Sequence, residues 1–275
     1  MVCHGYPLIG RLYELHEKIC SLDSLNPCKD VDTLFTQLVL TCMPPTHNHI
    51  DVTTLCKKAQ QMRSDLIRLG GEAEGLLESH FATILGSFDR PIEKLEIFPY
   101  YGNYLKLAQL EFTLLTQHCT HVPNKVAFVG SGPLPLSSIV LALNHLTTTS
   151  FHNYDMDPLA NSKAARLISS DPDLSKRVLF HTCDVLKVTE ELKEYDVVFL
   201  AALVGMDKEE KARAIEHLGR YMKSGAILMV RSAHGARVFL YPVVDVQSDL
   251  GGFEVLSVFH PKDEVINSVI VARKC

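Results

Sequence analysis

The chain has 275 residues, a formal net charge of −5 and 47% hydrophobic residues. This composition is typical of a globular protein with a sizeable core, and the absence of a basic excess argues against nucleic-acid binding. The longest apolar run, Val197 to Met206, is too short to cross a bilayer, and Arg11 and Glu14 interrupt any signal peptide. Eight cysteines without a Cys-x-x-Cys pair indicate reduced thiols. We therefore expect a cytoplasmic protein without an integral membrane segment.

The first part of the chain shows only helical periodicity. Apolar residues recur at spacings of three and four, and they do so near 8–22, 31–39, 52–69, 73–88 and 100–117. Pro44-Pro45, Gly70-Gly71 and Arg90-Pro91 punctuate these stretches. The pattern predicts an N-terminal helical bundle over residues 1–121, with separate helices on the two sides of the glycine pair.

After residue 121, short β-rich runs alternate with helical stretches. Strands are expected at 126–129, 150–154, 178–181, 196–200 and 226–230. Two late strands, 253–259 and 265–272, are joined by five residues, which predicts an antiparallel hairpin at the sheet edge. The fold class is therefore α/β. Residues 122–275 are expected to form a Rossmann-like domain with a mostly parallel seven-stranded sheet, as in S-adenosylmethionine-dependent transferases.

A glycine turn follows the first strand, and acidic residues follow the second. Gly130, Ser131 and Gly132 lie where the strand meets its helix, so a ligand can approach the backbone closely. Asp155 ends the next strand and is the better candidate for accepting hydrogen bonds from ribose hydroxyls. Asp157 is a second candidate, although it could simply cap the following helix. This layout predicts a nucleoside-binding site.

Two further loops lie at the same expected edge. Asp184 and Val185 follow the third strand, where such folds contact the adenine, although Asp184 could equally be a loop or cap residue. Ala201 and Ala202 follow the fourth strand. Their small side chains would let a sulfonium and the reacting carbon come close, and the alternative is ordinary core packing.

Basic residues follow the fifth strand. Arg231, His234 and Arg237 are expected at the carboxyl edge of the sheet, facing the cleft. Arginine suits planar carboxylates because it offers paired hydrogen bonds. These three residues are therefore candidates for binding a substrate carboxylate, and pairing with a surface acid is the alternative.

Carboxylates and phenols are also grouped in the helical part. Glu74 and Glu78 lie four residues apart, on one face of a helix, and spacing alone favours a solvated surface pair. Tyr100, Tyr101 and Tyr104 follow one another closely, and a core corner is the simplest interpretation. Histidines are dense at His47-Asn-His49 and His118-Cys-Thr-His121, but neither spacing matches a metal site.

Taken together, the chain resembles plant-type nicotianamine synthases along essentially its whole length. The segments that carry the resemblance are Gly71–Glu78, Ile97–Leu107, Phe128–Leu136, Asp196–Asp207, Arg231–His234 and Phe239–Pro242. The resemblance implies condensation of three S-adenosylmethionine molecules into nicotianamine, with release of three methylthioadenosines by successive 3-amino-3-carboxypropyl transfers and azetidine ring closure. A small-molecule methyltransferase that uses S-adenosylmethionine is the alternative.

The resemblance also implies roles for the residues. A glutamate of the helical part, Glu74 or Glu78, would act as the base beside Tyr100, Tyr101 or Tyr104. S-adenosylmethionine would be the substrate, and no metal would be required for catalysis, although the product chelates iron, zinc and copper. The partners would be small molecules only, and an oligomer is compatible with the sequence.

Overall fold

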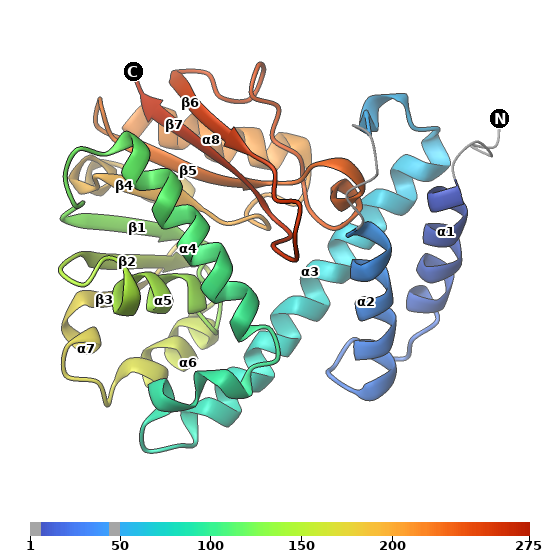
Figure 1. The fold of residues 1–275 in the computed structure, drawn as a ribbon, viewed down its shortest axis with the longest axis horizontal. Coiled ribbons are helices and arrows are strands. Elements are labelled where there is room, and N and C mark those ends of the chain that lie inside the picture. Colours follow the sequence, from blue (N-terminus) through green and yellow to red (C-terminus); the bar gives the residue numbers. More distant parts are fainter. Residues whose placement is uncertain (1–6, 44–49) are drawn as a thin grey trace.

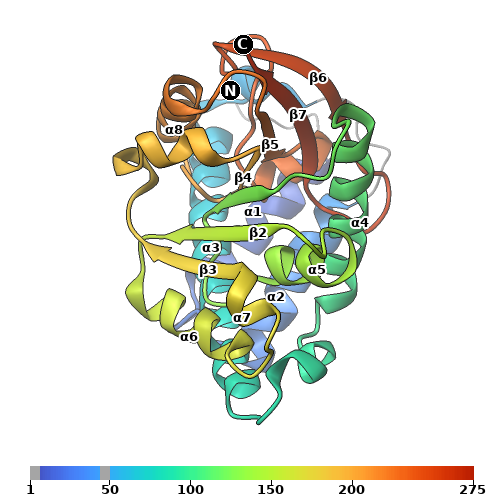
Figure 2. The same ribbon diagram turned by 90° about the vertical axis from the view of Figure 1, so that its left-hand side faces the viewer.

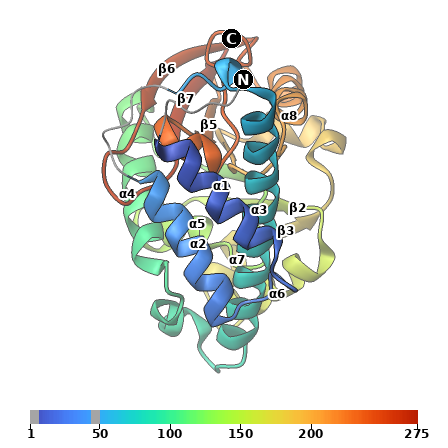
Figure 3. The ribbon, with the colours of Figure 1, turned by 90° about the vertical axis from the view of Figure 1, so that its right-hand side faces the viewer.

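The computed structural model describes residues 7–43 and 50–275 (Figure 1). The N-terminal part is helical, as predicted. Its elements are α1 (Pro7–Cys20), α2 (Lys29–Cys42), η1 (Val52–Thr54), α3 (Lys57–Gly86), η2 (Pro91–Ile97) and α4 (Tyr101–His118). Figure 3 views this part from outside, with α1 and α2 in front of α3. The predicted break at Pro44-Pro45 lies outside the described residues.

Helix α3 corrects one prediction, because Gly70 and Gly71 do not separate two helices. A single helix of 30 residues runs through both glycines. Each interior glycine costs roughly 1 kcal/mol relative to alanine, which tertiary packing can outweigh. A Cβ on Gly71 would stand 3.4 Å from the side chain of Leu203, at the near limit of ordinary van der Waals contact, so α3 packs against the loop after the fourth strand at this glycine. The helix therefore reaches from α1 to α6 at the far side of the molecule (Figure 1).

The strands in the remaining part of the chain form one seven-stranded sheet with the order β3-β2-β1-β4-β5-β7-β6 (Figure 2). The strands are β1 (Lys125–Val129), β2 (Ser150–Asp155), β3 (Val178–Thr182), β4 (Val197–Leu200), β5 (Ile227–Ser232), β6 (Phe253–Phe259) and β7 (Ser268–Lys274). The pairs among β1 to β5 are parallel, whereas β7 is antiparallel to both β5 and β6. The predicted parallel sheet and antiparallel hairpin are therefore confirmed, with β7 starting three residues later than expected.

Helices cover both faces of the sheet. One face packs against α4, α5 (Leu136–Asn144), α6 (Pro158–Ile168) and α7 (Leu174–Arg177). The other packs against η3 (Val185–Lys187), η4 (Glu190–Glu194) and α8 (Lys208–Tyr221). Figure 2 shows α4 and α5 on one side of the strands and α8 on the other. A third core joins α1, α2 and the first half of α3 to η5 (Gly235–Phe239).

The expected division at residues 121 and 122 stays a prediction. Leu114 and Leu115 of α4 belong to the same core as Val126 of β1 and Phe199 of β4. The last helix before the proposed boundary therefore packs as a layer of the sheet, and the helices that stand apart from the sheet are α1 and α2.

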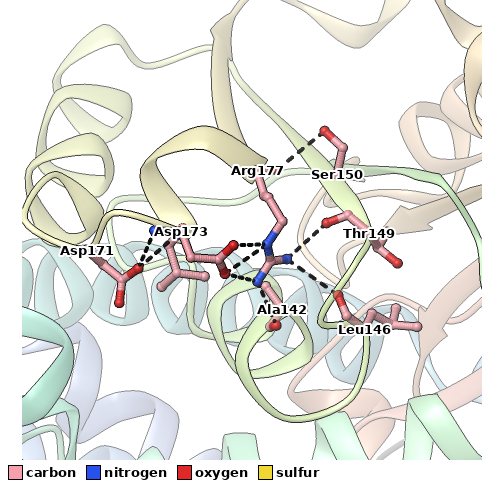
Figure 4. A network of polar contacts seen from close by, with 8 residues as sticks. Ala142, Leu146, Thr149, Ser150, Asp171, Asp173 and Arg177 are labelled. Atoms are coloured by element: carbon pink, nitrogen blue, oxygen red, sulfur yellow. Dashed lines mark hydrogen bonds and ion pairs between the residues drawn. The ribbon is translucent and has the colours of Figure 1, made fainter.

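Arg177 fixes the edge of the sheet at which β2 and β3 begin (Figure 4). Its guanidinium pairs with Asp173 and donates hydrogen bonds to the carbonyls of Ala142 and Thr149, at 3.2 and 3.0 Å. Cationic donors commonly satisfy the free carbonyls at a helix end in this way. The opposite edge, where the parallel strands end, is left free for a ligand.

Candidate active site

A cavity of about 880 Å³ lies at the carboxyl ends of the parallel strands. The glycine turn after β1 and the loops after β2, β3 and β4 form its floor. Helices α2 and α3 and the segment 98–107 contribute to its walls, as do Arg231, Tyr241 and Asn267. This volume is within the usual range for small-molecule sites, and carboxyl ends of strands are the usual place for them in open α/β sheets.

The glycine turn is constrained from two sides. Gly130 and Gly132 have φ angles of +80° and +65°, which favour glycine. A Cβ on Gly130 would stand 2.2 Å from a methyl group of Val204, and one on Gly132 would stand 2.9 Å from Oε2 of Glu78. Ser131 lines the cavity, and its buried hydroxyl has no hydrogen-bond partner among the described residues.

The two aspartates after β2 have different surroundings. Asp155 lines the cavity, and its carboxylate accepts hydrogen bonds from the backbone N–H groups of Gly132 and Asp157, at 2.8 and 3.0 Å. Asp157 is exposed and caps α6 by accepting from the N–H of Leu159 at 2.8 Å. The geometry thus places Asp155 at the cavity and gives Asp157 the capping role that the sequence left open.

The loop after β3 meets the cavity as expected. Asp184 and Val185 both line it. The Asp184 carboxylate also caps η3 by accepting from the N–H of Leu186 at 2.9 Å. The two interpretations of Asp184 are therefore compatible, since one carboxylate oxygen has a backbone partner and the other can serve a ligand.

Lys211 holds the loop after β4 in place, and sequence reasoning missed it. Ala201 and Ala202 line the cavity, and their carbonyls accept hydrogen bonds from Nζ of Lys211 at 2.9 and 2.8 Å. The Lys211 side chain is only 1% exposed. Burial lowers the pKa of its amine to about 7.

Two glutamates of α3 face the cavity, and each is paired with a tyrosine from another part of the chain. Oε1 of Glu78 accepts a hydrogen bond from the hydroxyl of Tyr104 at 2.9 Å, and its Oε2 points to Gly132. One helical turn away, Oε2 of Glu74 accepts from the hydroxyl of Tyr241 at 2.9 Å. All four side chains line the cavity. The glutamates are therefore not a solvated surface pair.

Burial is the main cause of altered proton affinity in these pairs. Burial, followed by the neighbouring charge of Glu74, raises the pKa of Glu78 to about 8, against the hydrogen bond from Tyr104. Burial likewise raises the pKa of Glu74, against the hydrogen bond from Tyr241. Burial and then the nearby glutamates raise the pKa of both tyrosines, which therefore stay neutral donors.

Arg231 lines the same cavity, and hydrogen bonds to Glu111 and Ser137 fix its guanidinium. Its Nε and Nη2 donate to the two carboxylate oxygens of Glu111 at 2.7 and 2.9 Å, and Nη2 also donates to the hydroxyl of Ser137 at 2.7 Å. Glu111 and Arg231 are 0% and 7% exposed. The Nη1 donors have no hydrogen-bond partner among the described residues. A guanidinium that is fixed through Nε and Nη2 and keeps its Nη1 donors can orient a substrate carboxylate.

Of the other residues expected at the site, Tyr100 reaches the cavity wall, and Tyr101, His234 and Arg237 do not. Tyr100 lies at the cavity wall with 47% exposure, whereas Tyr101 packs into the core beneath. His234 stacks on His260, and Arg237 donates to the backbone carbonyls of the 260–263 loop. Neither residue lines the cavity, because η5 turns this segment towards α2 and α3.

Sequence reasoning did not single out Tyr241, Glu111, Ser137 or Asn267. Tyr241 lay within a quoted motif, but nothing in the motif showed that it meets α3. The sequence did offer a signal for Glu111, because it is a charged residue among the otherwise apolar buried positions of α4. Asn267 lines the cavity, and its buried Nδ2 has no partner among the described residues.

The described residues contain no cluster of three or more His, Cys, Asp or Glu side chains that could hold a metal ion. His118 instead hydrogen-bonds Ser257 at 3.1 Å, and His47 and His49 lie outside the described residues. Within the described ranges, Cys20, Cys28, Cys42, Cys119, Cys183 and Cys275 are free thiols, and no helix has the length and apolarity to cross a membrane.

The strand order, the glycine turn and the cavity at the strand ends define an α/β protein with the fold of S-adenosylmethionine-dependent methyltransferases. Magnesium protoporphyrin IX methyltransferase from Synechocystis PCC 6803, solved with bound SAM, superposes with a TM-score of 0.50 and 17% identity, over 63% of this chain and 80% of that one. MtNAS in complex with MTA and tNA superposes with a TM-score of 0.83 and 22% identity, over 98% of this chain and 99% of that one.

The sequence matches the family described as nicotianamine synthase protein over residues 5–275. It is 61% identical to nicotianamine synthase of Solanum lycopersicum over 275 residues, which is 100% of this chain and 86% of that protein. It is 59% identical to nicotianamine synthase 1 of Arabidopsis thaliana over 277 residues, with the same two coverages. The chain belongs to the nicotianamine synthase family, and its activity is that of this family of transferases.

Proposed function

We propose that the cavity binds S-adenosylmethionine as a donor of 3-amino-3-carboxypropyl groups and that Glu78 is the base. The adenine lies at Asp184 and Val185, and the ribose hydroxyls donate to Asp155. The methionine arm then passes the glycine turn and reaches the reaction centre. Asp155 retains acceptor capacity for the ribose, since a carboxylate has about four lone-pair sites and backbone groups use two of them.

The charges around the cavity favour this substrate. Its acidic lining residues are Asp32, Glu74, Glu78, Asp155, Asp184, Glu210 and Glu264. Arg231 is the one lysine or arginine among its described lining residues, and Glu111 offsets its charge. A sulfonium with an ammonium group is attracted to such a lining, while the Nη1 donors of Arg231 suit the carboxylate of the substrate.

The position of Glu78 carries the assignment of the base. Tyr104 occupies one oxygen of the carboxylate, and the other points to Gly132, where the amino-acid end of the donor passes. The attacking α-amine must be neutral, and a model α-amine has a pKa of roughly 7.7–8.0. Because the pKa of Glu78 is about 8, the proton can move to it without a large change in free energy.

Each transfer then balances in atoms and electrons. The amine nitrogen forms a bond to the γ-carbon of the donor, and the bond between this carbon and sulfur breaks. The electron pair goes to sulfur, which leaves as the neutral thioether of methylthioadenosine, and the proton goes to Glu78 and on to solvent. Ring closure repeats the step within one arm. Positioning supplies most of the rate, since the sulfonium is already a good leaving group.

We propose further that the reaction needs no metal, because no poor leaving group has to be activated. Protein dialysed against a chelator should keep its initial rate, and loss of the rate with recovery on adding one metal would contradict this. Incubation with S-adenosylmethionine alone should give nicotianamine and methylthioadenosine in a one-to-three ratio by mass spectrometry. S-adenosylhomocysteine formed on adding acceptors would instead indicate a methyltransferase.

A further inference from the structure

Arg237 is a buried cation away from the reaction centre, and the proposed function gives it no part. It belongs to η5 and is 6% exposed. Its Nη1 donates a hydrogen bond to the carbonyl of Pro261, and its Nη2 donates to the carbonyl of Asp263 at 2.7 Å. Burying a guanidinium costs free energy, which an apolar side chain in the same place would avoid. The two hydrogen bonds therefore point to a task on the connection between β6 and β7.

That connection, residues 260–267, is one wall of the cavity. Its lining residues are Glu264, Ile266 and Asn267. Figures 2 and 3 show the connection beside α4, and the side chain of Asn103 on α4 donates to the carbonyl of Glu264 at 2.6 Å. Arg237 and α4 thus hold the same short segment from two sides.

The hold of Arg237 on the main chain extends to the cavity. The carboxylate of Asp263 accepts a hydrogen bond from the N–H of Val265 at 3.1 Å, and Val265 is buried in the core that α4 shares with the sheet. Asn267 follows immediately before β7 and lines the cavity. Its buried Nδ2 has no hydrogen-bond partner in the part of the chain that the structure describes. Fixing residues 261–263 therefore also fixes where this amide lies.

Asn267 and Arg231 lie on the same face of the sheet. Arg231 of β5 is directly opposite Val269 of β7, and side chains two residues apart along a strand share a face. Asn267 is therefore a diagonal neighbour of Arg231, a position that is roughly 7–8 Å away in a regular ladder. Both side chains line the cavity, and a carboxylate has two oxygens, so one oxygen can accept from each of them.

We propose that Arg237 is a positioning residue, which fixes the 260–267 connection so that Asn267 binds the substrate carboxylate together with Arg231. The strand order separates this pair from the nucleoside, because β4 lies between β5 and β7 on one side and β1, β2 and β3 on the other. Loss of Arg237 should therefore weaken binding of the amino-acid end of the substrate and leave binding of the nucleoside unchanged. This inference rests on the proposed role of Arg231.

The test is a double-mutant cycle on the KM for S-adenosylmethionine. Arg237→Met and Asn267→Ala should each raise KM about tenfold, since each costs the substrate carboxylate one hydrogen bond. The double variant should show the same increase as either single variant, because Arg237 acts through Asn267. The affinity for methylthioadenosine, which lacks the carboxylate, should stay parental in calorimetry. A merely structural loss would lower both affinities together.

Arg273→Met is the matched control. It is the same substitution on the strand that follows the connection, and Arg273 is 40% exposed, with Glu254 as its ion-pair partner at 3.4 Å. This variant should keep the parental KM, because an exposed pair of this kind contributes little.

A parental KM in Asn267→Ala would overturn the inference, and so would increases that multiply in the double variant. If Arg237→Met folds poorly, Arg237→Lys keeps the charge but not the fork that spans two carbonyls, so its KM should still rise. A parental KM in Arg237→Lys would then overturn the inference as well. The proposed function can fail separately, since turnover of Glu78→Gln tests the base and the KM of an Arg231 variant tests the carboxylate site itself.

Discussion

Oε2 of Glu78 lies 2.9 Å from the point where a Cβ on Gly132 would stand. The long helix α3 and the glycine turn after β1 therefore touch at the centre of the cavity. This contact joins the seven-stranded sheet to the N-terminal helices.

Gly132→Ala should weaken nucleoside binding and activity together. The new Cβ would force Glu78 away, and alanine at a φ of +65° costs roughly 1–2 kcal/mol. Gly225→Ala is the matched control, since Gly225 has a φ of +82° but no heavy atom within 4 Å of its Cβ position. Both variants should lose similar thermal stability, and only Gly132→Ala should lose affinity for methylthioadenosine in calorimetry. Equal affinity in the two variants would contradict the contact.

The raised pKa of Glu78 predicts how stability depends on pH. Between the ordinary value of 4.5 and the folded value of about 8, the folded protein keeps a proton that the unfolded chain has lost. The contribution of Glu78 to stability therefore falls as pH rises through this window. Glu78→Gln cannot ionise, so its free energy of unfolding relative to the parent should rise from pH 4.5 to 8 and then level off. Urea titrations at several pH values measure this difference, and a constant difference would count against the burial of Glu78.

The buried pair of Arg231 and Glu111 should respond unequally to single and double substitutions. Glu111→Gln leaves a buried guanidinium without its counter-charge, which costs about 3–5 kcal/mol. The double variant Glu111→Gln/Arg231→Met should recover much of this loss in thermal denaturation. Its KM for S-adenosylmethionine should nevertheless be higher than that of the parent protein, because the Nη1 donors of Arg231 are gone. A double variant with parental KM would exclude Arg231 from substrate binding.

Lys211→Met should loosen the loop after β4. The substitution keeps a long apolar side chain but leaves the carbonyl of Ala202 without a donor and that of Ala201 with only the N–H of Val204 at 3.3 Å. An unpaired group of this kind costs about 1–3 kcal/mol. The affinity for methylthioadenosine should fall along with stability. Lys208→Met on the exposed start of the same helix is the control and should change neither. Unchanged nucleoside affinity in Lys211→Met would show that the loop does not depend on this lysine.

The strands and most helices were predictable because their signals are local. Alternating β-rich and helical runs gave the parallel sheet, and the five-residue link gave the hairpin. The glycine pair in α3 misled the prediction, since glycine destabilises a helix locally while the decisive packing comes from distant segments. Gly71 packs beside Leu203, which lies 132 residues further along the chain and cannot be seen in a local pattern.

The site was only partly predictable for the same reason. Spacing placed Glu74 and Glu78 on one face of a helix but could not show what that face meets. The partner of Glu74 is Tyr241, 167 residues away, and only the folded chain brings them together. Arg231 and Arg237 looked alike in sequence, yet the last residues of β5 keep Arg231 at the cavity while η5 turns Arg237 to backbone carbonyls.

The proposed function depends on Glu78, which is held by Tyr104 and takes the proton of the attacking amine beside the glycine turn. The most direct test measures methylthioadenosine release from S-adenosylmethionine in Glu78→Gln and Tyr104→Phe, with the affinity of each variant for methylthioadenosine as the reference. Glu78→Gln should lose about 10²–10⁴-fold in turnover at nearly parental affinity, and Tyr104→Phe should lose less. Turnover of Glu78→Gln within a few-fold of the parent would contradict the account.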